Sequence, residues 1–175
     1  MSPILALFFG VPGTGKTTFA RAAARALELP LLPIDAFVDL LPIEQMTLPT
    51  PYWDTLYQIL FRLADIQLSL GIGAIIDAPF YLIREREAAR QVALDRGARF
   101  VGIRTYCSDR ELWRRRVERR LAGSEPEDRV ADWEAVLARE RMFEPWTSPH
   151  EVLSVDTALA LEDNLSKVLA FLQSA

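Results

Sequence analysis

The stretch Gly10-Val11-Pro12-Gly13-Thr14-Gly15-Lys16-Thr17 decides the fold of this chain. An apolar run at residues 4–9 precedes it, and a helical segment at residues 18–27 follows it. Glycine adopts backbone angles that are closed to other residues, so such a loop can turn successive amide hydrogens inward as an anion-binding nest. The following helix adds its positive dipole end. Strand, glycine loop and helix together predict a phosphate-binding P-loop.

The side chains of this loop predict how a nucleotide would be held. Lys16 can reach the terminal phosphates and act in catalysis, and the Thr17 hydroxyl is placed to ligate Mg²⁺. We expect the nucleotide to contact eight residues: Gly10, Pro12, Gly13, Thr14, Gly15, Lys16, Thr17 and Thr18.

Length and composition restrict the class of protein. The 175 residues suggest one domain spanning 1–175, and half of them are hydrophobic, which is typical of a globular chain. The net charge of −4 makes nucleic acid an unlikely main partner. The single cysteine excludes an internal disulfide, and the single histidine excludes a multi-histidine metal centre. No apolar run reaches the roughly 18 residues of a membrane span, so we expect a soluble cytoplasmic protein. We expect it to be either a monomer or a homodimer.

Hydrophobic periodicity predicts alternating strands and helices. Short apolar runs predict strands at 4–9, 31–34, 74–77, 100–103 and 152–155. Helical spacing and caps predict helices at 17–27, 53–70, 83–96, 111–121, 132–142 and 161–172. Asp109 is the predicted N-cap of the helix at 111–121. This alternation predicts an α/β fold with three layers, in which helices cover both faces of a five-stranded parallel sheet. Pro33 suggests that the second strand lies at an edge.

Two aspartates end predicted strands and are candidates for chemistry. Asp77 ends the third strand, as a Walker B aspartate does, and could bind Mg²⁺ with Thr17. The residue after Asp77 is Ala78, which disfavours motor-type ATPases that carry a glutamate there. Asp35 follows the second strand and could accept the proton of a substrate hydroxyl. The alternative for either aspartate is a cap for the next turn.

The segment after Asp35 could form the acceptor site. Residues 35–57 carry apolar and aromatic side chains between several prolines, which predicts either a lid over an acceptor pocket or core beneath a long loop. Asp39, one helical turn after Asp35, could orient the acceptor hydroxyl or be solvated.

A dense run of arginines follows the fourth strand. Arg116 and Arg120 share one face of the predicted helix, where they could neutralise charge on a transferring phosphoryl group. With the polar loop that follows, they predict an arginine lid at residues 114–130. The alternative is a solvated helix face paired with Glu111 and Glu118. The six arginines of the run are Arg110, Arg114, Arg115, Arg116, Arg119 and Arg120.

These residues together resemble the small P-loop kinases, a group that includes nucleoside monophosphate kinases, shikimate and gluconate kinases, polynucleotide kinase, zeta toxins and chloramphenicol phosphotransferase. The resemblance covers the whole chain. The runs Phe143-Glu144-Pro145 and Val155-Asp156-Thr157 are similar to the zeta-toxin-like group, and residues 35–42 are similar to chloramphenicol phosphotransferase, where the first aspartate is the proposed base. Polynucleotide kinases typically carry an arginine shortly after that aspartate, and positions 36–38 lack one.

The resemblance implies an ATP-dependent kinase with an arginine lid, which moves the γ-phosphate of Mg-ATP to a hydroxyl of a small molecule. ATP is favoured over GTP because the chain has no Asn-Lys-x-Asp guanine motif. Two alternatives stay open. One is a kinase of 5′-hydroxyl polynucleotides or nucleotide sugars, and the other is an ATP-binding switch that hydrolyses ATP slowly without a small-molecule acceptor.

Overall fold

The computed structural model describes residues 2–38, 40, 52–123, 132–146 and 151–174. Within these ranges, no helix is both long and apolar enough to cross a membrane. The elements, in chain order, are β1 (Ile4–Phe9), α1 (Lys16–Leu27), β2 (Leu31–Pro33), α2 (Asp35–Val38), α3 (Tyr52–Ser69), β3 (Ala74–Asp77), α4 (Ile83–Asp95), β4 (Arg99–Tyr106), α5 (Arg110–Leu121), α6 (Trp133–Met142), β5 (Val152–Asp156) and α7 (Leu161–Gln173).

The five strands form one parallel sheet in the order β2-β3-β1-β4-β5. β1 is the central strand, and its Phe8 pairs with Asp77 of β3 while its Phe9 pairs with Arg104 of β4. The chain first builds the sheet on one side of β1 and then on the other, so the loop after β1 lies at the point where ligands bind in such sheets. The predicted parallel α/β sheet is confirmed.

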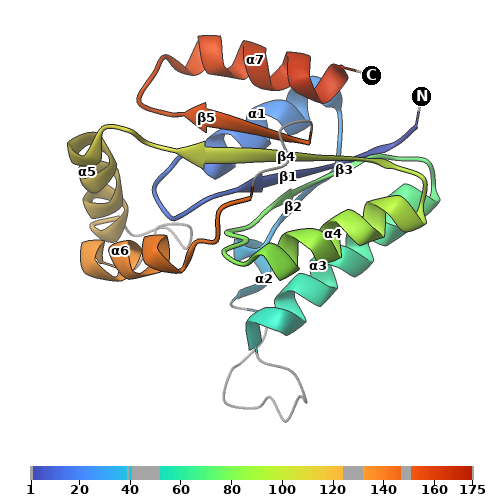
Figure 1. Ribbon diagram of the computed structural model, residues 1–175, viewed down its shortest axis with the longest axis horizontal. Coiled ribbons are helices and arrows are strands. Elements are labelled where there is room, and N and C mark those ends of the chain that lie inside the picture. The colour runs from blue at the N-terminus through green and yellow to red at the C-terminus, as the bar shows by residue number, and fades with distance from the viewer. Residues whose placement is uncertain (1, 39, 41–51, 124–131, 147–150, 175) are drawn as a thin grey trace.

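Helices cover both faces of the sheet (Figure 1). α3 and α4 pack on one face through a cluster of buried residues that includes Leu56, Leu60 and Ala89. α1 and α7 pack on the other through a cluster that includes Phe19 and Val168. Strands buried on both faces explain the continuous apolar runs in the sequence.

Most predicted boundaries shift by one residue, and the larger differences lie in β4 and α2. β2 ends at Pro33 and lies at the sheet edge, where a missing backbone N–H costs no ladder hydrogen bond. β4 runs on to Tyr106, beyond the predicted end at residue 103, because it is paired with both β1 and β5. The charged Arg104 fits there because its guanidinium stacks on the Tyr106 and Phe143 rings. The short helix α2 occupies part of the segment expected to be irregular.

A third buried cluster lies beyond the carboxyl ends of the strands, where α5 and α6 pack (Figure 1). It joins Val11 of the glycine loop to Trp113 and Val117 of α5 and to Val136 of α6. The predicted cap at Asp109 is confirmed, because its carboxylate accepts a hydrogen bond from the Leu112 backbone N–H at 2.9 Å. The loop and these two helices therefore share one small core.

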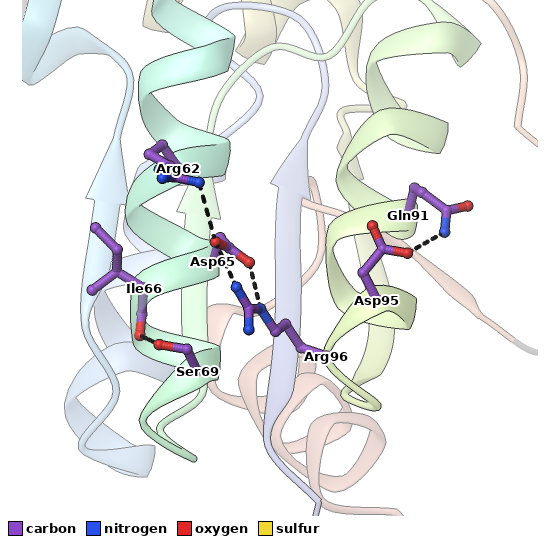
Figure 2. A network of polar contacts seen from close by, with 7 residues as sticks. All are labelled: Arg62, Asp65, Ile66, Ser69, Gln91, Asp95 and Arg96. Carbon is purple, nitrogen blue, oxygen red and sulfur yellow. Dashed lines mark hydrogen bonds and ion pairs between the residues drawn. The ribbon is translucent and has the colours of Figure 1, made fainter.

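A polar network fastens α3 to the end of α4 (Figure 2). The Asp65 carboxylate accepts two hydrogen bonds from the Arg96 guanidinium, at 2.6 and 3.0 Å, and lies 3.6 Å from Arg62. Gln91 donates to Asp95 at 2.6 Å within α4. These helix ends precede β3 and β4, so the network lies at the amino ends of the strands, opposite the glycine loop.

Candidate active site

At two positions of the glycine loop, the backbone accommodates only glycine. Gly10 has a φ of +139°, and a Cβ there would lie 2.3 Å from the Thr105 carbonyl oxygen. Gly13 has a φ of +80°, and a Cβ there would lie 2.7 Å from a methyl group of Val117. Both distances are far below ordinary contact. The loop is therefore pressed directly against β4 and α5.

Two side-chain hydrogen bonds hold the shape of the loop, one from Thr14 within it and one from Trp113 of α5. The Thr14 side chain is fully buried, and its hydroxyl donates to the Val11 carbonyl at 2.7 Å and lies 2.9 Å from the Thr105 hydroxyl. The Trp113 indole N–H donates to the Pro12 carbonyl at 2.8 Å. The Thr14 hydroxyl and the Pro12 carbonyl are thus both hydrogen-bonded to other groups of the protein.

A pocket of about 460 Å³ opens on the outer side of the loop. Of the eight predicted nucleotide contacts, it brings together Gly13, Gly15, Lys16, Thr17 and Thr18. Gly10 and Thr14 instead line a separate cavity of about 210 Å³ on the inner side. The larger pocket is closed by α5 and by the turn after β5, through Arg116, Arg119, Arg120, Thr157, Leu159 and Leu161.

Lys16 is the first residue of α1, and its ammonium donates to the Val11 carbonyl at 3.4 Å. Burial lowers the pKa of Lys16, the carboxylates of Asp77 and Asp35 act in the opposite direction, and Arg120 lowers it further. These groups therefore lie close enough to feel one another's charge. Phosphate groups entering the pocket would stabilise the charged form of Lys16.

Asp77 and Thr17 form a pair of oxygen donors beside Lys16. Asp77 ends β3, pairs with Phe8, and is only 4% exposed. Burial raises the pKa of Asp77, whereas Lys16 and a hydrogen bond from the Thr17 side chain lower it. One carboxylate and one hydroxyl suit Mg²⁺, which binds few protein ligands and completes its shell with water and substrate phosphates. The pair fits the predicted metal site.

Asp35 opens α2 at the carboxyl end of β2, where the sequence predicted a base. The Ile34 backbone N–H donates to the Asp77 carbonyl at 2.9 Å, which fixes Asp35 beside β3. Its side chain is exposed, and its charge raises the pKa of both Lys16 and Tyr81. Asp35 is therefore close enough to Lys16 for the two charges to interact. Asp39, residues 41–51 and the 124–131 part of the predicted lid lie outside the described residues.

The arginine run divides into two sets on α5. Three of its members make ion pairs on the outer surface: Arg110 with Glu140, Arg114 with Glu118, and Arg115 with Glu111. These three arginines agree with the alternative prediction of a solvated helix face. Arg116, Arg119 and Arg120 instead line the pocket.

The two arginines predicted to be catalytic have different surroundings. Arg116 donates to the Thr157 hydroxyl and to the Thr157 carbonyl, both at 2.9 Å. Arg120 is half-buried, its guanidinium makes no hydrogen bond or ion pair with any residue that the structure describes, and its charge lowers the pKa of Lys16. Arg120 is thus the one whose guanidinium is available to phosphate.

Sequence reasoning missed Arg86, which is fully buried on α4. Its guanidinium lies 5.0 to 5.5 Å from the ring centres of Phe9, Phe143 and Trp146. It donates to the Phe80 carbonyl at 3.2 Å and to the Glu144 carbonyl at 2.6 Å. Burial lowers the pKa of Arg86 to about 10. Arg86 therefore fixes the Phe143-Glu144-Pro145 run against the sheet. The helical spacing of α4, which places Arg86 on its buried face, is the sequence signal that could have predicted this burial.

Sequence reasoning also missed Tyr81 and Arg139, which lie near Asp35. Tyr81 follows β3, and Arg139 lies on α6. Burial raises the pKa of Tyr81 to about 12, Arg139 opposes this, and Asp35 adds to it. No local spacing connects these three residues, because they come from three separate parts of the chain.

The strand order, the glycine loop after the central strand and the Thr17–Asp77 pair define a P-loop nucleotide-binding fold. A sequence family described as AAA domain (AAA_33) matches residues 5–145, which is most of the chain. The chain belongs to this family. Among curated proteins, none matches the chain at the significance threshold that the solved structures pass.

Solved structures similar to this chain include P-loop kinases. A candidate kinase from Chloroflexus aurantiacus J-10-fl is 25% identical, with a TM-score of 0.74 over 99% of this chain and 100% of that one. A sugar kinase from Janibacter sp. HTCC2649 is 18% identical, with a TM-score of 0.74 over 100% of this chain and 96% of that one. The APS kinase CysC of Mycobacterium tuberculosis, solved with AMPPNP and APS, is 18% identical, with a TM-score of 0.66 over 99% of each chain. The kinase-like fold is thus confirmed, and the narrower likeness to zeta toxins and chloramphenicol phosphotransferase stays a prediction.

Proposed function

We propose that this protein is an ATP-dependent kinase that transfers the γ-phosphoryl group of Mg-ATP to a hydroxyl of a small molecule. One observation carries the proposal: Asp35 at the end of β2 lies close enough to Lys16 to raise its pKa, and the Thr17–Asp77 pair lies beside Lys16. Lys16 and the loop suit the phosphates of a nucleotide, and Asp35 suits a substrate hydroxyl. A protein that only bound and released ATP would have no use for a carboxylate at Asp35.

The chemistry follows from these positions. The Asp35 carboxylate accepts the proton of the acceptor hydroxyl as that oxygen forms a bond to the γ-phosphorus. The bond from the γ-phosphorus to the β–γ bridging oxygen breaks, and ADP leaves with the electron pair. Lys16 and Arg120 offset the negative charge spread over the phosphoryl oxygens. Mg²⁺, held by Thr17 and Asp77, supplies further neutralisation of phosphate charge when it is bound.

The larger pocket supports a role for α5 in closing over the nucleotide. Arg116, Arg119 and Arg120 line one wall, and the turn after β5 lines the other with Leu159 and Leu161. Apolar side chains at one end and cations at the other match a nucleotide, whose base is apolar on its faces and whose phosphates are charged. We therefore assign the base to the Leu159 side and keep residues 114–130 as the proposed lid.

ATP is the proposed donor. The sequence lacks the Asn-Lys-x-Asp motif that reads guanine, and the Mycobacterium tuberculosis APS kinase, which shares the fold, was solved with the ATP analogue AMPPNP. The proposed acceptor region at 35–57 includes Asp35 and the first turn of α3, which begins at Tyr52.

The experiment that tests the proposal follows label from γ-³²P-ATP into a panel of sugars, sugar acids, nucleosides, hydroxylated antibiotics and a 5′-hydroxyl oligonucleotide. The chain has only two lysines, so Lys16→Ala has a matched control in Lys167→Ala, at an exposed position on α7. Wild type and Lys167→Ala should label one class of small molecule, and Lys16→Ala should not. Labelling of the oligonucleotide alone, or Mg-ATP binding and hydrolysis with no labelled acceptor, would contradict the proposal.

A further inference from the structure

The cavity of about 210 Å³ on the inner side of the glycine loop is separate from the nucleotide pocket. Gly10, Val11 and Thr14 of the loop form one of its walls, and its lining shares no residue with that of the nucleotide pocket. Among the described residues that line it, neither Asp35 nor Asp77 is present. The cavity is therefore distinct from both the nucleotide pocket and the proposed acceptor site.

The other walls of this inner cavity come from β4 and from the segment that follows α6. β4 contributes Arg104, Thr105 and Tyr106, and the segment after α6 contributes Phe143 and Pro145. A water molecule takes up about 30 Å³ in the liquid, so the volume of the cavity is several times that of one water. The cavity therefore has room for a small oxygen anion with water beside it.

Arg104 is the cation in the wall of the inner cavity. Its half-buried guanidinium lies 5.1 Å from the ring centre of Phe143 and 5.9 Å from that of Tyr106. Contacts of this kind use the faces of the rings and provide no acceptor for the N–H donors. Among the described residues, none makes a hydrogen bond or ion pair with this guanidinium. Half-buried donors without acceptors are unfavourable, and a bound anion would offset that cost.

A second guanidinium adds to the positive charge beside the cavity. Arg86 is fully buried, its guanidinium lies 5.0 Å from the centre of the same Phe143 ring, and its Nε has no hydrogen-bond partner. Burial lowers the pKa of Arg86 and Arg104 lowers it further, whereas Glu144 and Glu85 act in the opposite direction. The two arginines therefore repel each other across a short distance, and an anion beside Arg104 would relieve this repulsion.

The carboxylate in the wall of the cavity, Glu140 of α6, already has a partner. Its two oxygens each accept a hydrogen bond of 2.9 Å from the Arg110 guanidinium, which offsets its charge. The Cys107 thiol, also in the wall, donates to the Asp109 carbonyl at 3.3 Å. The charges that line the inner cavity therefore favour an anion over a cation.

We propose that the inner cavity is a second ligand site, which binds a small oxygen anion, either a carboxylate or a tetrahedral oxyanion, with Arg104 as its anchor. A planar guanidinium can hold such a group through two parallel hydrogen bonds. The rings of Phe143 and Tyr106 hold the guanidinium at the wall of the cavity. The bound anion would contact the inner side of the glycine loop. This inference is independent of the proposed transfer reaction.

The test uses inorganic sulfate as a probe and fills the nucleotide pocket first. Protein saturated with Mg-AMPPNP is titrated with sodium sulfate by calorimetry, at an ionic strength held constant with chloride, so that the glycine loop offers no phosphate site. Arg104→Gln is the test variant, and Arg104→Lys keeps the charge. Arg115→Gln is the control, because Arg115 is exposed and pairs with Glu111. Titrations with acetate and with inorganic phosphate distinguish a carboxylate from a tetrahedral oxyanion.

Glu140→Gln supplies a variant with the opposite expected sign, which a loss of folding cannot imitate. Removing this negative charge from the wall should strengthen sulfate binding about threefold. We expect one sulfate to bind to wild type and equally to Arg115→Gln, about tenfold more weakly to Arg104→Gln, and about threefold more weakly to Arg104→Lys. Three results would each overturn the inference: no sulfate binding to wild type, equal affinity in wild type and Arg104→Gln, or weaker binding to Glu140→Gln.

Discussion

Arg116 on α5 donates two hydrogen bonds, both of 2.9 Å, to Thr157, the residue that follows β5. The Thr157 hydroxyl in turn donates to the Tyr106 carbonyl at 3.0 Å, at the end of β4. One arginine thus connects the helix on one wall of the nucleotide pocket to the turn on the other. We therefore propose that Arg116 positions the two walls of the pocket and that Arg120 contacts the phosphates.

The first prediction separates Arg116 from its neighbour Arg115, which is exposed on the same helix and pairs with Glu111. Arg116→Gln should raise the Kd for Mg-ATP about tenfold, because two charge-assisted hydrogen bonds that shape the pocket are lost. Arg115→Gln should change it less than about twofold. Calorimetry gives both values. An Arg116→Gln variant with normal ATP affinity and a strongly reduced kcat would show direct contact with the transferred phosphoryl group.

The second prediction concerns the close contact of the loop with α5. Gly13→Ala introduces a methyl group 2.7 Å from Val117 at a φ of +80°. We expect it to lower the free energy of unfolding by about 3 kcal/mol and to abolish measurable ATP binding. Gly97→Ala is the control, because Gly97 has a φ of +61° but nothing within 4 Å of the added carbon. That variant should lose only about 1 kcal/mol in urea unfolding and keep ATP binding. Similar losses for both would show that steric contact at Gly13 is unimportant.

The third prediction follows from the buried Asp77. Burial raises the pKa of Asp77, so in the free protein it takes up a proton at a higher pH than an ordinary aspartate, whose pKa is about 3.9. Protonation removes the charge that attracts Mg²⁺. The gain in ADP affinity caused by Mg²⁺ should therefore shrink as the pH falls from 8 toward 5.

Asp77→Asn separates this effect from the titration of the ADP phosphate itself, whose pKa is about 6. The variant should show little gain from Mg²⁺ at any pH, measured by calorimetry with Mg²⁺ and with EDTA. A gain in Asp77→Asn equal to that of wild type across the range would remove Asp77 from the metal site.

The fourth prediction tests the buried arginine on α4. Arg86→Ala leaves the carbonyls of Phe80 and Glu144 without their donor and opens a cavity among three aromatic rings. It should lower the free energy of unfolding by about 3 kcal/mol. Arg84→Ala, which removes an exposed contact of 3.6 Å with Asp54, should cost about 0.5 kcal/mol or less. Equal costs in urea unfolding would show that the clamp on Glu144 contributes nothing.

Local signals in the sequence carried the prediction of the fold. The glycine spacing, the apolar runs and the cap at Asp109 each act within a few residues, so the strands, the P-loop and the start of α5 could be located in advance. The positions of Asp35 and Asp77 could be predicted for the same reason, because each lies at the carboxyl end of a strand and parallel strands end at one edge.

The remaining features depend on contacts between distant segments. The charge of Arg139 acts on Tyr81. The segment after α6 is hydrogen-bonded to the Tyr81 backbone, which no spacing in the sequence shows. The division of the arginines on α5 likewise depends on Thr157, some forty residues later. Arg86 shares the helical spacing of the buried Ala89 and Ala93, but its aromatic neighbours come from β1 and the 143–146 segment, which local spacing does not reveal.

The most direct test of the account compares wild type with Asp35→Asn in transfer of phosphate from γ-³²P-ATP to the acceptor found in the panel. Asp65→Asn, in the network at the opposite end of the strands, is the control. Asp35→Asn should bind Mg-ATP normally but lower kcat for transfer at least about a hundredfold, the usual effect of losing a general base. Asp65→Asn should keep wild-type transfer. If Asp35→Asn transferred phosphate within a few-fold of the wild-type rate, the site would not work as described.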